Sequence, residues 1–161
     1  MPGQKNTGRK DKELNLDTLS LEMGTRPPQA VDVEEAVIGA MLVESSCVAD
    51  AVGELSSTSF YAPKCRMIFE AIRKLEEAHE SIDLITVSQQ LKKDKHLEDV
   101  GGNPALAELS MRIGAAAHVE RYIQILKEKD IQRKLITASY DILKEAYDEY
   151  QESVRFANGE S

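Results

Sequence analysis

The sequence predicts an all-α fold: a compact helical globule of about five to six helices, followed by a long projecting C-terminal helix. Apolar residues recur at three- and four-residue spacing through most of the chain, and no segment shows the strict alternation of a half-buried strand. Short segments with Gly or Pro separate the apolar runs, as in compact helical domains. Residues 117–150 contain neither Gly nor Pro, so one helix of about 50 Å is expected there.

Composition bounds the class of protein. The chain has 161 residues, of which 42% are hydrophobic and 30% charged, which suits one domain with an appendage. No apolar run approaches the roughly 20 residues that span a bilayer, and the N-terminus lacks the apolar core of a signal peptide, so we expect a cytoplasmic protein. The net charge of −8 weighs against nucleic-acid binding by electrostatics, because phosphate contacts need clustered Lys and Arg.

Residues 1–30 are predicted to be a flexible tail, because Gly and Pro punctuate a polar sequence there. Its leucines have two interpretations, a short docking segment or scattered residues of a disordered leader. The apolar residues concerned are Leu14, Leu16, Leu19, Leu21 and Met23.

Residues 31–126 are predicted to form the globule. Five helix starts are expected, each at residues that cap or open helices; they fall at Asp32 (with Glu35 as its capping-box partner), Ser45-Ser46, Pro63, Asp83 and Asn103-Pro104. Phe69 and Ile72 lie on the apolar face of the third helix and should occupy the centre of the core. Cys47 and Cys65 fall on apolar positions, so we expect free buried thiols.

The second half of the long helix, residues 127–150, is predicted to be a projecting arm. Residues 127–130 place charge around a whole turn, so this turn should be solvated. Two apolar seams follow, each with an average step of 3.5 residues, the coiled-coil period. One seam contains Ile131, Leu135, Ala138 and Ile142; the other contains Ile136, Tyr140, Leu143, Tyr147 and Tyr150. These seam residues are the candidate sites of self-association or partner binding.

The arm has more than one interpretation. It projects and packs on another helix or chain, or it is a core helix of a larger bundle that the end of the chain cuts off. If it projects, it pairs with the arm of a second copy, or it frays beyond Lys129. Residues 151–161 are predicted to be a polar C-terminal tail.

The sequence predicts no catalytic, cofactor-binding or metal-binding residue. The chain has no G-x-x-x-x-G-K-[ST] motif for nucleotide phosphates. His79, His96 and His118 stand far apart, without metal-ligand spacing. The neighbours Glu34 and Glu35 are expected on a helix surface, where adjacent side chains point about 100° apart and do not form an acid–base pair.

Residues 26–148 contain, in order, several blocks that together resemble one family. The blocks are 26–29 (Arg-Pro-Pro-Gln), 34–42 (Glu-Glu-Ala-Val-Ile-Gly-Ala-Met-Leu), 60–75, 82–87 (Ile-Asp-Leu-Ile-Thr-Val), 100–102 (Val-Gly-Gly), 122–129 and 133–136 (Arg-Lys-Leu-Ile). The sequence resembles the N-terminal domain of DnaB-type replicative DNA helicases. Cys65, where the family often has His, and Ala105, where an aromatic is common, are local departures.

The resemblance implies a scaffold function in DNA replication. In that family the domain is a globule with a helical hairpin, it assembles as a trimer of dimers on the hexameric helicase ring, and it contacts the C-terminal domain of primase and the helicase loader. ATP and Mg belong to the family's ATPase domain, which we expect to be absent from this sequence together with the returning helix of the hairpin. A stand-alone adaptor that binds the helicase or primase is the alternative.

Overall fold

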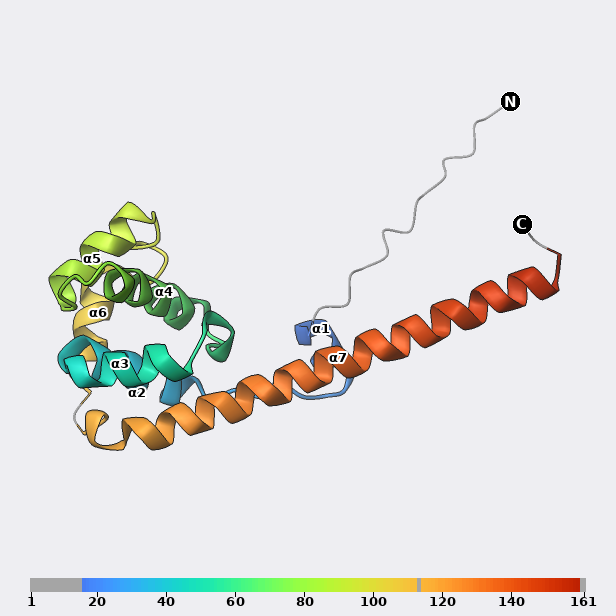
Figure 1. The fold of residues 1–161 in the computed structure, drawn as a ribbon, viewed down its shortest axis with the longest axis horizontal. Helices are drawn as coiled ribbons and strands as arrows, with labels where there is room; N and C mark the ends of the chain where they lie inside the picture. Colours follow the sequence, from blue (N-terminus) through green and yellow to red (C-terminus); the bar gives the residue numbers. More distant parts are fainter. Residues whose placement is uncertain (1–15, 113, 160–161) are drawn as a thin grey trace, which may run out of the picture. The chain divides into compact units, whose positions relative to one another are not determined.

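In the computed structural model, which describes residues 16–112 and 114–159, every regular element is helical (Figure 1). The all-α prediction is therefore confirmed for that part of the chain. In chain order the elements are α1 (Leu16–Glu22), α2 (Val31–Val43), α3 (Ser45–Glu54), the 3-10 turn η1 (Ser57–Ser59), α4 (Pro63–Glu77), α5 (Leu84–Lys93), α6 (Gly102–Ser110), the 3-10 turn η2 (Ala116–His118) and α7 (Val119–Ala157).

The core lies in a compact unit formed by Pro28–Leu135. Within it α2 packs against α3, α4 and α6, and α5 packs against α4 and α6. Phe69 and Ile72 of α4 are completely buried, as predicted, and the ring of Phe60 lies on that of Phe69 with 4.7 Å between the centroids. Both cysteines are free and buried, which confirms that prediction as well.

Two of the five predicted helix starts are confirmed in detail. α4 begins at Pro63, where the missing N–H costs no hydrogen bond. Asp83 caps α5: its carboxylate accepts hydrogen bonds from the backbone N–H groups of Ile85 (2.8 Å) and Thr86 (2.9 Å). The Thr86 hydroxyl accepts in return from the Asp83 N–H at 2.9 Å, which completes a capping box.

The caps predicted for the two preceding helices are wrong. α2 begins at Val31, one residue before the expected start at Asp32. Its N-cap is Ala30, and no side chain caps it. Its supposed capping partner, Glu35, instead forms ion pairs with Arg112 and with Lys64, the latter at 3.6 Å. The N-cap of α3 is Glu44. The Glu35 side chain thus binds residues distant in sequence and does not cap its own helix.

The two terminal segments are more helical than predicted. α1 lies in the segment that was predicted to be a flexible tail; the expected tail residues 1–15, Leu14 among them, lie outside the described residues. α7 continues to Ala157 and so includes most of the predicted polar tail, 151–161. Gly159, two residues after the end of α7, has a left-handed φ of 72°, the conformation that commonly terminates helices.

α4 ends at a left-handed residue that is not glycine, which gives a testable prediction. His79 has φ 56°, and the backbone N–H of Glu80 reaches the Leu75 carbonyl at 2.9 Å in a Schellman-type ending. Because this conformation strains an L-residue, we expect His79→Gly to raise the free energy of unfolding by up to about 1 kcal/mol in urea titrations. Ala78→Gly, at the preceding right-handed position, should instead lower it; equal effects would contradict the assignment.

Candidate self-association surface

From Ile131 onward, α7 carries large apolar side chains that are exposed to solvent. Ile142 is 68% exposed, Tyr147 62%, Leu143 57% and, earlier in the helix, Leu135 61% and Ile131 55%. In the globule, by contrast, large apolar side chains such as Phe69 and Ile72 are completely buried. A repeated run of exposed apolar side chains is unusual in a soluble protein, which makes these residues the candidate contact surface.

The remaining seam residues complete this surface. Ile136 and Tyr140 are half-buried and Ala138 is exposed, and all belong to the same continuous helix. Beyond them the helix adds Tyr150 (66% exposed), Val154 (39%) and Phe156 (86%). The last two were assigned to a polar tail and are additions to the predicted surface. We refer to the exposed and half-buried apolar residues of α7 from Ile131 to Phe156 as the α7 surface.

A buried polar cluster lies at the N-terminal edge of the α7 surface. Arg133 is 7% exposed; its guanidinium donates one hydrogen bond to the Pro28 carbonyl (2.8 Å) and one to the Thr58 carbonyl (2.7 Å). It also lies 5.9 Å from the centroid of the Tyr61 ring. Asp130, 8% exposed, accepts from Lys134 at 2.8 Å and from the Thr58 hydroxyl at 3.3 Å. The prediction that residues 127–130 are solvated all round is therefore wrong.

Glu34 lies in the same region. The prediction that it lies on a helix surface is wrong, because its side chain is buried. It is 1% exposed; one carboxylate oxygen accepts from the Ala62 N–H at 3.1 Å, and the other has no hydrogen-bond partner within the described structure. Burial raises the pKa of the Glu34 carboxyl, although hydrogen bonds from the Ala62 and Tyr61 backbone and the charges of Arg133 and Arg66 act to lower it. The raised pKa means that the charged form is the costlier one here.

This pKa shift predicts how stability depends on pH. A carboxyl whose pKa is higher in the folded than in the unfolded state contributes stability that is present below the unfolded pKa and is lost as pH rises through the folded pKa. Lowering the pH from neutral toward about 5, just above the ordinary range of Glu, should therefore stabilise the wild type relative to Glu34→Gln in thermal melts. Glu120→Gln, at an exposed position, is the control. A wild type whose melting temperature falls relative to that of Glu34→Gln on acidification would contradict this prediction.

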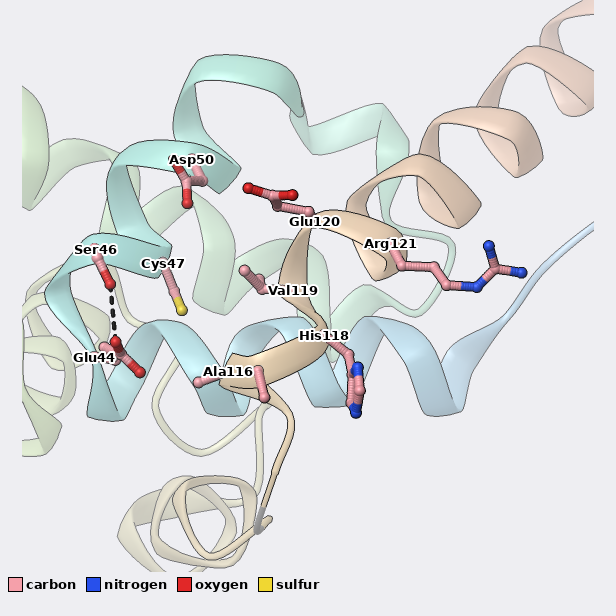
Figure 2. A pocket seen from close by; sticks show the side chains of 10 residues that line it. Glu44, Ser46, Cys47, Asp50, Ala116, His118, Val119, Glu120 and Arg121 are labelled. Atoms are coloured by element: carbon pink, nitrogen blue, oxygen red, sulfur yellow. Dashed lines mark hydrogen bonds between the residues drawn. The ribbon is translucent and has the colours of Figure 1, made fainter.

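A surface pocket of about 320 Å³ lies between α3 and the start of α7 (Figure 2). Cys47 and His118 both line it, a pair of residue types that can form a nucleophile and a base. However, burial raises the pKa of the Cys47 thiol, and Figure 2 shows His118 pointing away from it. A protonated thiol without a facing base is not an activated nucleophile, so this pocket is not a cysteine-based active site.

The described residues contain neither a cluster suited to a metal ion nor a helix suited to cross a membrane. His, Cys, Asp and Glu side chains nowhere gather in groups of three or more that suit a metal ion in residues 16–112 and 114–159. In the same residues, no helix combines the length and the apolar character needed to cross a membrane. The α7 surface and the polar cluster beside it are therefore the features from which a function is inferred below.

The described elements define an all-helical domain, and comparison with known proteins identifies its family. The sequence model of the DnaB-like helicase N terminal domain matches residues 26–128. The replicative DNA helicase DnaB of Rhodothermus marinus is 36% identical over 147 residues, which are 91% of this chain and 16% of that protein. The DnaB of Geobacillus stearothermophilus is 34% identical over 121 residues, 75% of this chain and 27% of that protein. The chain belongs to the DnaB-like helicase N-terminal domain family.

Solved structures agree with this assignment. The N-terminal domain of DnaB helicase from Mycobacterium tuberculosis aligns with a TM-score of 0.71 and 31% identity, over 76% of this chain and 88% of that one. The N-terminal domain of DnaB from Helicobacter pylori, described together with its interactions with primase, shares the fold with a TM-score of 0.58 and 24% identity over 72% of this chain and 90% of that one. The chain spans about 16% and 27% of the lengths of the two relatives above, and the region they share is the N-terminal domain.

Proposed function

We propose that this chain is the scaffold domain of a replicative DNA helicase and that the α7 surface is its self-association site. The observation that carries the proposal is the exposure of Leu135, Ile142, Leu143 and Tyr147 along one helix. Burying these side chains on a partner would remove apolar area worth about 25 cal/mol per Å². Ring assembly of the helicase is the process that such a scaffold would serve.

The spacing of the apolar residues supports a helix as the covering partner. Both seams repeat every 3.5 residues on average, which is the period of helices that pack along their length. A second copy offers the same surface, and an isologous pair lets each copy cover the other. On the opposite face of this half of the helix lie Thr137 and Lys144, both exposed. Polar residues there remain solvated in such a pair.

The proposal is tested by changing one residue on each seam. Leu135→Asp combined with Leu143→Asp places a carboxylate on each, and an unpaired buried charge is costly, so we expect association to weaken by at least about tenfold in sedimentation velocity over a concentration series. Thr137→Asp with Lys144→Gln makes the same net change of charge on the opposite face and should leave association unchanged. A wild type that stays monomeric to high micromolar concentration, or equal association of both variants, would contradict the proposal.

Contacts with primase and with the helicase loader form the second part of the proposed function. The support is that the Helicobacter pylori domain of the same fold is described with its interactions with primase. We expect purified primase of the same organism to bind this chain, and isothermal titration calorimetry at micromolar concentrations measures it. The seam double variant separates the two activities: primase binding should survive the loss of self-association if the surfaces differ. Absence of binding heat with a folded chain would remove primase from the proposed function.

A further inference from the structure

We propose that Arg133 is a positioning residue, which holds the first half of α7 on the globule and fixes the point beyond which the helix depends on a partner. The residues involved all belong to the unit Pro28–Leu135. The dependence of the later part of α7 on a partner rests on the proposed self-association site. The attachment of the first half of α7 through Arg133 does not rest on it.

The buried face of α7 changes character along the helix. It begins with the apolar residues Val119, Ile123 and Leu126 and continues, at the same four- and three-residue steps, with Asp130 and Arg133. After Arg133 no residue of the described part of α7 is buried. The turn from Asp130 to Arg133 is thus held by polar contacts, and Arg133 is the final buried residue of the described part of α7.

Arg133 is bound to two segments that are far apart in sequence. One acceptor, the Pro28 carbonyl, precedes α2, and the other, the Thr58 carbonyl, lies in η1. Tyr61, after η1, places its ring against the same guanidinium. The planar guanidinium can donate to both carbonyls at once, whereas the single ammonium of a Lys at this position has a different reach and geometry. The entering chain, the η1 turn and α7 are therefore joined through one side chain.

Asp130 strengthens the same attachment from one turn earlier. Its carboxylate accepts from the Thr58 hydroxyl at 3.3 Å, so residues 130 and 133 both contact the η1 turn. Asp130 also lies 3.9 Å from the Arg133 guanidinium. Loss of Arg133 would leave a buried carboxylate and two backbone carbonyls with fewer partners, which is costly in a site closed to water. The helix would then detach as far back as Leu126, the last buried apolar residue.

The experiment is hydrogen exchange with mass spectrometry on the full chain, at a concentration where sedimentation shows it to be monomeric. We expect Arg133→Met to speed exchange in peptides covering residues 127–134 by at least about tenfold, the loss of two charge-assisted hydrogen bonds. Peptides from α4 should change by less than about twofold. Gln132→Met, at the exposed neighbouring position, is the matched control and should leave both regions unchanged.

Arg133→Lys provides a second variant that keeps the charge, and its exchange in residues 127–134 should fall between the wild type and Arg133→Met. Unchanged exchange in Arg133→Met would overturn the positioning role. So would equal acceleration in α4 and in residues 127–134, because that shows general destabilisation of the globule. A wild type that never associates contradicts the proposed function but leaves this readout intact, since it is made on the monomer.

Discussion

Phe69→Ala should lower the free energy of unfolding by about 3–5 kcal/mol, the largest single effect expected in this chain. The side chain is completely buried in α4 and its ring contacts that of Phe60. Truncation leaves a cavity in close-packed surroundings and removes the aromatic contact. A loss of this size is a large part of the total stability of a small domain.

Urea titration at one fixed protein concentration measures this effect without interference from changes in association. Phe156→Ala makes the same chemical change at a side chain that is 86% exposed, and it should change stability by no more than about 0.5 kcal/mol. A loss below about 1 kcal/mol for Phe69→Ala would show that α4 does not supply the centre of the core.

Gly39→Ala is expected to be the second most damaging change, although alanine normally favours a helix. A Cβ at Gly39 would lie 2.3 Å from the backbone carbonyl oxygen of Leu109, so α2 and α6 could not pack as they do. Overpacking of this kind costs roughly 1–3 kcal/mol. A backbone atom cannot rotate away, so the helices themselves have to move apart.

Gly53→Ala is the control for that change. Gly53 lies in α3, and a Cβ there would meet no atom within 4 Å. Alanine at this position should raise the free energy of unfolding by up to about 1 kcal/mol through helix propensity. Thermal melts of the two variants should therefore move in opposite directions; a Gly39→Ala variant as stable as the wild type would contradict the close approach of α2 and α6.

The helical class and the core of the globule were predictable because the apolar spacing of its helices matches their buried faces. Phe69 and Ile72 continue a regular apolar face of α4. Pro63 opens α4 and Asp83 caps α5 through interactions with neighbouring residues, so both helix starts can be predicted without the tertiary structure. The errors at Asp32 and Glu35 arose differently. Glu35 has the spacing of a capping partner, but Arg112, 77 residues away in sequence, binds it instead, and no local pattern reveals such a partner.

The charges of residues 127–130 alone predict exposure, so they do not identify the buried polar cluster. Asp130 and Arg133 continue the spacing of Val119, Ile123 and Leu126 on the buried face of α7, so the period itself contained the signal. Likewise, Glu34 lies three and four residues before the buried Val37 and Ile38. A charged residue in phase with an apolar face can be buried when backbone groups of other segments bind it. The identity of those groups, the carbonyls of Pro28 and Thr58, depends on the fold.

The period of the sequence identifies the apolar residues of α7 from Ile131 to Tyr150 but does not include Val154 and Phe156, and the role of these residues in association stays a prediction. Those two residues follow Tyr150 at four- and six-residue steps in a stretch rich in polar residues, so they were read as isolated. What covers the surface is a property of two molecules and is not contained in the periodicity of one. We propose α7 of a second copy as that partner.

Site-specific photo-crosslinking tests that pairing most directly. A benzophenone amino acid placed at Leu143, on the α7 surface, should capture a second copy of the chain, with crosslinked peptides from residues 136–157 of that copy. The same group at Lys144, on the opposite face, should give at most background dimer. Capture from Lys144 as efficient as from Leu143, or crosslinks from Leu143 that fall only within α2 to α6 of the second copy, would contradict pairing through the α7 surface.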